Sequence, residues 1–160
     1  MSVNRHLPHV FVLPEDDANR QIANGFLLDE QLLSGRIRVL EEAGGWKEVL
    51  DRFCSVYARE MDRFTERRMI LLIDFDNQIA RLAMATQRIP ANLRPRVFIL
   101  GALTEPERLK EDLGSYERIG LSIARDCRES ADQIWQHRLL QHNLSEVGRL
   151  REHIRPILFP

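Results

Sequence analysis

Acidic side chains gather at three points of the chain, each soon after a short apolar run. Mg²⁺ prefers oxygen ligands and usually takes one or two carboxylates together with water and substrate phosphate. Acids packed this closely would repel one another unless a bound cation offset their charge. The pattern therefore predicts a Mg²⁺ or Mn²⁺ site. Its candidate ligands are Asp16, Asp17, Asp74, Asp76 and Glu105, with Glu15 as the candidate general base or a further ligand.

The same acids also have a simpler interpretation as helix caps. Asp and Glu are common at helix N-termini, and each turn from a strand into a helix needs a cap. Asp17 or Asp76 would then have no other role. One cap explains a single acid at each turn but not three acid-rich turns, so the pattern favours the metal site. Arg20 and Arg81, one turn into the following helices, are candidates for phosphate binding or for solvated surface arginines.

The apolar runs that precede the acids predict a parallel sheet. Helical periodicity fills the gaps between them, and alternation of strand and helix is typical of parallel sheets with right-handed crossovers. We therefore expect an α/β fold with a four-stranded, mostly parallel sheet flanked by helices. The carboxyl ends of such strands share one edge, where sites form. The predicted strands are 9–13, 36–40, 69–73 and 96–100.

The chain after residue 103 changes character and is expected to form a helical C-terminal extension. Residues 8–103 would form the α/β domain, and 104–160 would pack on it. An apolar stripe along the last helices favours this packing, and its alternative is a surface for a second copy or a protein partner. Asn143 and Glu146 resemble a capping box. The closing segment 155–159 is either a short strand or a docked tail. The helices are expected near 106–113, 116–130, 132–142 and 144–154.

Composition excludes several classes of protein. The chain has 160 residues, 44% of them hydrophobic, and 23 Lys+Arg against 24 Asp+Glu. This near-neutral balance argues against a strongly basic protein that coats nucleic acid. It does not exclude a groove that is basic only locally. Cys54 and Cys127 are far apart and form no zinc motif. No run approaches the ~20 apolar residues of a membrane helix, and no signal peptide is evident, so we expect a cytoplasmic protein without a membrane partner.

The order of these parts resembles the Toprim domain shared by bacterial primases, topoisomerases and overcoming-lysogenisation-defect nucleases. Glu15 matches the family's Glu after the first strand, and Gly44-Gly45 match its glycine pair after the second. Asp74 and Asp76 match its Asp-x-Asp after the third strand. The resemblance covers about residues 9–100. It implies that the aspartates hold Mg²⁺ and that the Glu acts in proton transfer or metal binding.

The chain departs from the family pattern at some positions. Asn19 stands where members often have Asp, and Ile79 where they usually have Gly. The leading prediction is a Mg²⁺-dependent phosphodiester hydrolase acting on DNA or RNA. One alternative is a catalytically inactive Toprim-like module that acts within a larger complex. Another is a receiver-like phosphoacceptor domain built on Asp74 and Thr104, although Lys110 has no strand before it as that reading requires.

Overall fold

The computed structural model describes residues 2–160 and shows one four-stranded sheet between layers of helices. All strand pairs are parallel, and the strand order is β2-β1-β3-β4. The predicted α/β fold is therefore confirmed, and each observed strand overlaps its predicted run. The strands are β1 (His9–Pro14), β2 (Ile37–Val39), β3 (Arg67–Leu72) and β4 (Val97–Leu100).

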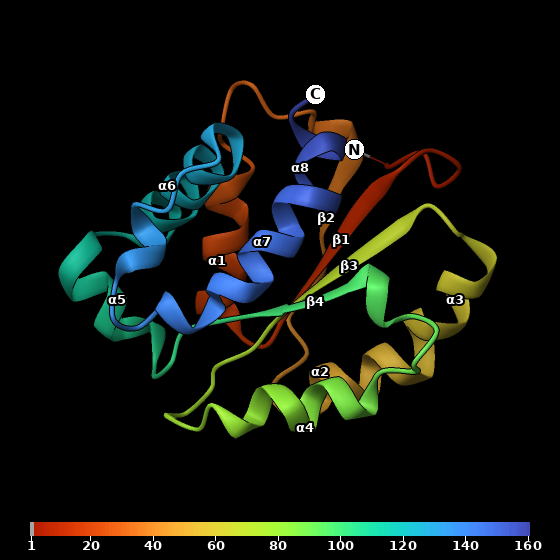
Figure 1. Ribbon diagram of the computed structural model, residues 1–160, viewed down its shortest axis with the longest axis horizontal. Helices are drawn as coiled ribbons and strands as arrows, with labels where there is room; N and C mark the ends of the chain where they lie inside the picture. Colours follow the sequence, from red (N-terminus) through yellow and green to blue (C-terminus); the bar gives the residue numbers. More distant parts are fainter. Residues whose placement is uncertain (1) are drawn as a thin grey trace.

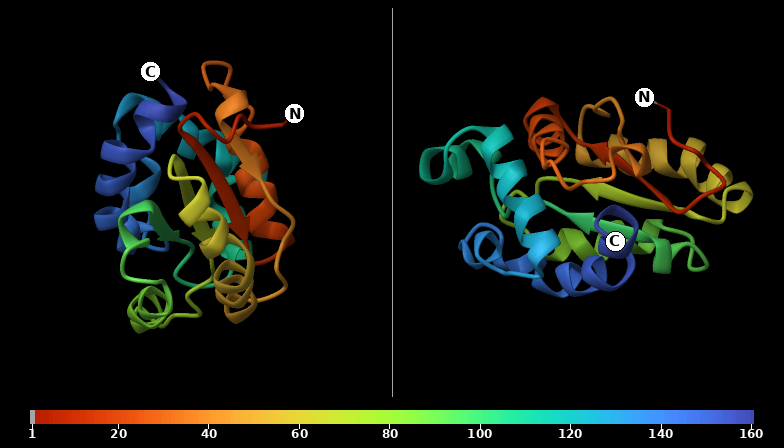
Figure 2. Two further views of the ribbon diagram at one scale, coloured as in Figure 1. Left: turned by 90° about the vertical axis from the view of Figure 1, so that its right-hand side faces the viewer. Right: turned by 90° about the horizontal axis from the view of Figure 1, so that it is seen from above.

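Two helical layers enclose the sheet (Figures 1 and 2). Alternate residues of each strand point to opposite faces, so β1 places Phe11 and Leu13 in one core and Val10 and Val12 in the other. The first face is covered by α2 (Trp46–Arg52), α3 (Ala58–Arg63) and α4 (Ala80–Arg88). The second is covered by α1 (Asp17–Phe26), α6 (Tyr116–Glu129), α7 (Leu144–His153) and α8 (Arg155–Leu158), with α5 (Pro106–Leu113) beside α6.

The structure corrects one local prediction and decides between the alternatives for another. The expected helix over 132–142 is replaced by two short 3₁₀ turns, Ile134–Gln136 and Gln141–Asn143. The buried Asp126 carboxylate accepts the Ile134 N–H at 2.8 Å and so anchors this segment without a helix. Between Gly45 and β3 the helical segment is not continuous, because a π-helical turn, Phe53–Tyr57, lies between α2 and α3. Of the two alternatives for the closing segment, the docked tail is confirmed: it forms α8 and buries Leu158 and Phe159 in the core.

The outer edge of β4 is covered by side chains of α7 and the turn before it. Asn143 accepts the Gly101 N–H at 3.2 Å and donates to the Gly101 carbonyl at 2.9 Å. Glu146 accepts the Ile99 N–H at 2.9 Å, and Arg149 donates to the Val97 carbonyl at 3.3 Å. Asn143 and Glu146 therefore do not form the expected capping box. Their side chains replace the backbone of a neighbouring strand.

Helices α1 and α6 pack backbone against backbone, which two glycines permit. A Cβ atom added to Gly25 would lie well under 3.0 Å from backbone atoms of Glu117, and one added to Gly120 would lie equally close to backbone atoms of Ile22. Real Cβ atoms essentially never approach backbone so closely. The extension is thereby joined to α1, an element of the first hundred residues.

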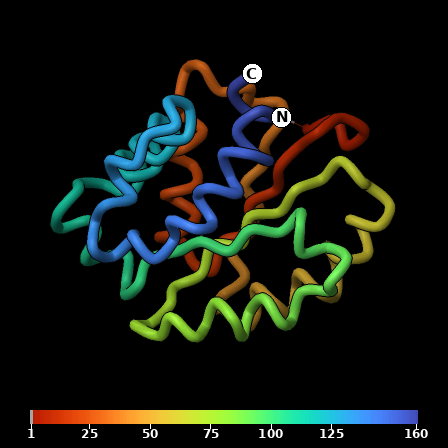
Figure 3. Tube along the Cα trace, in the orientation of Figure 1, coloured from red at the N-terminus to blue at the C-terminus, as the bar shows by residue number. Residues whose placement is uncertain are grey.

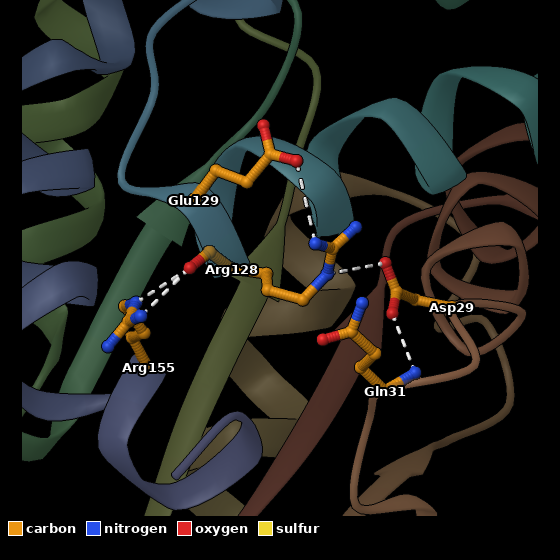
Figure 4. A network of polar contacts seen from close by, with 5 residues as sticks. All are labelled: Asp29, Gln31, Arg128, Glu129 and Arg155. Carbon is orange, nitrogen blue, oxygen red and sulfur yellow. Dashed lines mark hydrogen bonds and ion pairs between the residues drawn. The ribbon is translucent and has the colours of Figure 1, made fainter.

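The C-terminal helices also return to the beginning of the sheet, as the path of the chain shows (Figure 3). Leu158 of α8 is fully buried in the core that contains Val10 and Val12. A polar network closes this end of the molecule (Figure 4). Arg128 donates to the Asp29 carboxylate at 3.3 Å, and Arg155 donates to the Arg128 carbonyl at 2.8 Å.

The predicted apolar stripe of the extension lies mostly inside the molecule. Leu140, Val147 and Leu150 are at most 8% exposed and belong to the cores on the second face. Leu144 is the exception and is 37% exposed. Among residues 2–160, no helix is long and apolar enough to cross a membrane.

Candidate functional site

Glu15 lies at the carboxyl edge of the sheet and is held by backbone on two sides. Its N–H donates to the Leu72 carbonyl at 2.8 Å, and its carbonyl accepts the Gly44 N–H at 2.8 Å. Gly44 has φ +101°, a conformation that side chains disfavour and glycine accepts. Gly44 thus lets the loop after β2 come close to the end of β1. The Glu15 carboxylate accepts the Asp74 N–H at 2.5 Å, which links the ends of β1 and β3.

A second set of contacts connects Asp74 with the start of α1. Asp16 is the N-cap of α1 and accepts both the backbone N–H and the side-chain amide of Asn19, each at 2.9 Å. The same Asn19 amide nitrogen donates to the Asp74 carboxylate at 3.1 Å. The carboxyls of Asp16 and Asp74 therefore share one amide, and the Glu15 carboxylate joins them through the Asp74 N–H. We call these four residues the acid cluster.

The acid cluster includes only one aspartate of the Asp-x-Asp pair. Between the two, Phe75 is 1% exposed and its N–H donates to the Ala102 carbonyl, so the loop continues the sheet for a short distance. Asp76 and Asn77 then adopt positive φ, 49° and 57°, and the chain turns away. As a result the Asp76 side chain is 76% exposed, while Asp74 is partly buried.

Arg81 is held beside the acid cluster rather than free on the surface. Its guanidinium donates to the Asp74 carbonyl at 2.6 Å, lies 3.9 Å from the Asp76 carboxylate and is stacked 4.4 Å from the centre of the Trp46 ring. The Arg81 side chain is 10% exposed. Such stacking and hydrogen bonding fix the orientation of the loop that carries both aspartates.

The remaining predicted residues lie apart from the acid cluster. Asp17 accepts hydrogen bonds from Arg20 and Gln21 on the exposed face of α1. Arg20 is engaged by two carboxylates, since it also lies 3.0 Å from Glu42. Glu105 is exposed before α5, and its side chain makes no hydrogen bond or ion pair with any of residues 2–160.

Burial and mutual repulsion favour protonation in the acid cluster. Burial raises the pKa of Asp74 to about 7; the Asn19 hydrogen bond opposes this rise, and the Glu15 and Asp16 charges add to it. Burial also raises the pKa of Glu15, against the effect of its hydrogen bond from the Asp74 N–H. No arginine, lysine or histidine nitrogen within residues 2–160 forms an ion pair with these three carboxyls. The charge of the neighbouring Arg81 lowers the pKa of Glu15, but Arg81 does not pair with any of the three carboxyls.

We expect the metal-free protein to lose stability as the pH rises from about 4 to about 7. Over this range the folded chain keeps the Asp74 proton, with a pKa of about 7, while the unfolded chain releases it near 3.8. The folded state binds more protons, so the free energy of unfolding falls as pH increases. Urea unfolding midpoints measured in a chelator at several pH values test this.

Asp74→Asn is the matched control, because it removes this titration. Burial lowers the pKa values of His9 and His142, which makes stability rise with pH, but both proteins contain these histidines and the effect cancels in the difference between them. The variant should gain stability relative to wild type between pH 4 and 7, and the difference should then level off. A difference that does not vary with pH would contradict the raised pKa of Asp74.

Two residues of the site were not assigned a role by the sequence patterns. Asn19 was noted only as a departure, yet it bridges two carboxyls. Tyr116, at the start of α6, is 8% exposed. Burial raises its pKa most, the Glu107 charge adds to this, and the charges of the nearby Asp16 and Asp74 raise it further. A tyrosine one hundred residues away carries no spacing signal that links it to the acids.

Comparisons of the chain with protein-family models, with curated proteins and with solved structures give no match. Within residues 2–160, no group of three or more His, Cys, Asp or Glu side chains is already placed around a common metal position. The site is thus defined by its own geometry, as a compact set of carboxyls at the carboxyl edge of a parallel sheet.

Proposed function

We propose that this chain is a Mg²⁺-dependent phosphodiester hydrolase of Toprim type that acts on DNA or RNA. The observation that carries the proposal is the acid cluster, in which carboxyls from the ends of β1 and β3 are packed together without an ion-pairing base. Above the Asp74 pKa of about 7, repulsion of this kind is costly unless a cation offsets it. Its position agrees with the rule that ligands bind beyond the carboxyl ends of strands.

The chemical type of these donors suits Mg²⁺, and the side chains would have to close around the ion, because within residues 2–160 no three of them surround one metal position. Glu15, Asp16 and Asp74 supply carboxylate oxygens, and Mg²⁺ needs only one or two of these because water and substrate phosphate complete its coordination. The Asp76 carboxylate would reach the same ion only if residues 76 and 77 adopted a different backbone conformation. A divalent cation bound there would neutralise phosphate charge and lower the pKa of a water molecule.

The chain's own groups would share the remaining tasks. Glu15 is half-buried, and burial raises its pKa, so it is a stronger base than an exposed carboxylate. Asn19 orients the Asp16 and Asp74 carboxyls through one amide. Arg81 fixes the Asp74 backbone, so we assign it to positioning rather than to direct phosphate binding.

The direct test is cleavage of single- and double-stranded DNA and RNA by the purified chain with Mn²⁺ or Mg²⁺. We expect slow cleavage with weak sequence preference and complete inhibition by a chelator. If metal binds and none of these substrates is cleaved, the catalytically inactive interaction module becomes the better proposal.

We also expect Mg²⁺ or Mn²⁺ to raise the melting temperature at pH 8. A ligand at 100 times its Kd adds about 2.7 kcal/mol to the free energy of unfolding, or about 5–10 °C for a chain of this size. The rise should shrink at pH 6, because Asp74 must lose its proton to bind. Scanning calorimetry at both pH values measures it.

Two variants make the metal measurement specific. Asp74→Asn should abolish the rise, whereas Asp17→Asn should retain it, because the Asp17 carboxylate faces Arg20 and Gln21. An equal rise in wild type and Asp74→Asn would place the ion elsewhere.

The receiver-like alternative gains no specific support. A receiver needs a fifth strand beside β4, and in residues 2–160 that place is taken by the side chains of Asn143, Glu146 and Arg149. Lys110 lies in α5 with its ammonium 5.1 Å from the centre of the Tyr116 ring.

A further inference from the structure

Arginine side chains gather where the strands begin, at the edge of the sheet opposite the acid cluster. Because all four strands are parallel, the segments that lead into them meet at this edge. The N-terminal loop, α3 and the start of β3 lie together there (Figure 1), and His6 contacts the Phe64 ring. Residues 2–9, 34–38, 58–68 and 94–97 contain nine arginines against three acids, Glu60, Asp62 and Glu66. This edge therefore has a net positive charge, although the whole chain has a net charge of −1.

Four of these arginines surround two phenylalanine rings. The Arg67 guanidinium lies 4.0 Å from the centre of the Phe11 ring and 5.1 Å from the centre of the Phe64 ring. Arg38, which is paired with Phe11 in the sheet, lies 6.0 Å from the Phe11 ring. The guanidinium groups of Arg5 and Arg63 lie 5.4 and 5.2 Å from the Phe64 ring. We call these four residues the arginine patch: Arg5, Arg38, Arg63 and Arg67.

The arginine patch has more positive charge than its acids offset. The Arg67 side chain is fully buried and is paired with Glu60 at 2.6 Å. Arg5, Arg38 and Arg63 are exposed, and none of them forms an ion pair with any of residues 2–160. Guanidinium groups that contact the same ring are at most about 10 Å apart, roughly one Debye length at physiological ionic strength, so their charges act on a ligand together. Burial lowers the pKa of Arg67, and the Arg5 charge lowers it further, against the effect of Glu60.

The exposed guanidinium groups are held in place for an anionic ligand. Contact with an aromatic ring orients a guanidinium and leaves its N–H groups available at the edge. These N–H groups match the geometry of phosphate and form two parallel charge-assisted hydrogen bonds with it. Phe11 and Phe64 each contact at least two arginines already, so neither ring is free to stack a nucleotide base, as binding of a single strand requires.

We propose that the arginine patch binds the phosphate backbone of double-stranded nucleic acid without reading its sequence. Exposed arginines without ion pairs account for the attraction, and a duplex presents one phosphate charge per about 1.7 Å of its axis, so several arginines can be engaged at once. The occupied rings account for the preference for a duplex over a single strand. The patch lies at the opposite edge of the sheet from the acid cluster, so this binding does not depend on the proposed hydrolase function.

The test is titration of a fluorescent DNA or RNA duplex with the full chain in a chelator, at several salt concentrations. The chelator prevents metal-dependent cleavage, so binding and cleavage can fail independently. We expect a Kd of about 10⁻⁴–10⁻⁶ M at physiological salt, and three exposed arginines predict a slope of log K against log salt of about −3. Absence of duplex binding at low salt, a slope near zero, or tighter binding of a single strand of the same length would overturn the proposal.

Variants locate the binding surface. Arg38→Gln and Arg63→Gln each remove one phosphate contact, so each should reduce the steepness of the slope by about one and weaken binding at ~0.1 M salt about five- to tenfold. Arg125→Gln is the matched control, because Arg125 is exposed on α6, far along the chain from the patch, and should leave slope and affinity unchanged. Melting curves confirm that each variant is folded. Equal slopes in wild type and both patch variants would overturn the proposal.

Two further measurements exclude other binding surfaces and other partners. Asp74→Asn should not change the salt slope, because Asp74 lies at the other edge of the sheet; a change as large as that of Arg63→Gln would place the nucleic acid at the acid cluster. Vesicles that contain anionic phospholipid present the same phosphate chemistry on a membrane surface. Binding of wild type to these vesicles but not to a duplex, with loss of vesicle binding in Arg63→Gln, would overturn the nucleic-acid assignment.

Discussion

Glu15→Gln should lower the rate of phosphodiester cleavage by about 10²-fold or more and leave the fold intact. The amide keeps the size of the side chain and still accepts the Asp74 N–H through its oxygen, so the link between β1 and β3 survives. What is lost is the carboxylate that would accept a proton or bind the ion, and general-base catalysis contributes typically ~10²–10⁴-fold. Initial rates at saturating Mn²⁺ measure the effect.

Asp17→Asn is the control for a general effect of removing an acid near the start of α1. It should cleave like wild type, because Asp17 is exposed and bonded to Arg20 and Gln21. Asp74→Asn should be as damaging as Glu15→Gln. Equal activity of wild type, Glu15→Gln and Asp74→Asn would identify a contaminating nuclease and remove the support for the site.

Asp76→Asn distinguishes the motif from the observed geometry. The exposed Asp76 carboxylate lies outside the acid cluster, so its loss should cost clearly less than the loss of Asp74. A loss as large as that of Asp74→Asn would mean that the turn after Phe75 rearranges when metal and substrate bind.

Gly120→Ala should destabilise the protein strongly. The added methyl would meet backbone atoms of Ile22 and Phe26, which cannot move aside as a flexible side chain can. Overpacking in a well-packed interior costs about 1–3 kcal/mol, and we expect the upper part of this range because α1 and α6 must separate. The melting temperature should fall by about 5–10 °C.

Gly148→Ala provides the matched comparison within another helix. Nothing lies within 4 Å of a Cβ built at Gly148 in α7, and alanine favours helix. This variant should be stabilised by up to about 1 kcal/mol. Similar melting temperatures for the two variants would show that the close approach of α1 and α6 does not hold in solution.

The sheet was predictable from sequence because its signal is local. Each strand is a short apolar run between turn residues, and the order of strands and helices determines a parallel arrangement. The segment 132–142 was not predictable in this way. Its helical periodicity was overridden by a tertiary contact, the Asp126 carboxylate on the Ile134 N–H, and no local pattern encodes that bond.

The site was predictable only in part, for the same reason. The rule that carboxyl ends of parallel strands meet at one edge led to Glu15, Asp16 and Asp74, which the structure brings together. The pairing of Asp74 with Asp76 rested on their spacing. The spacing could not anticipate that residues 76 and 77 adopt positive φ and direct the second carboxylate to solvent.

The covered edge of β4 has a consequence for how this protein behaves at high concentration. An uncovered edge strand offers free N–H and C=O groups on which another chain can add a strand, the first step of sheet-driven aggregation. Here Asn143, Glu146 and Arg149 already occupy those groups, and the opposite edge, β2, is only three residues long. Growth of the sheet from one copy of the chain into the next is therefore blocked at one edge and has little template at the other, so copies of this protein have no ready route to strand-by-strand polymerisation.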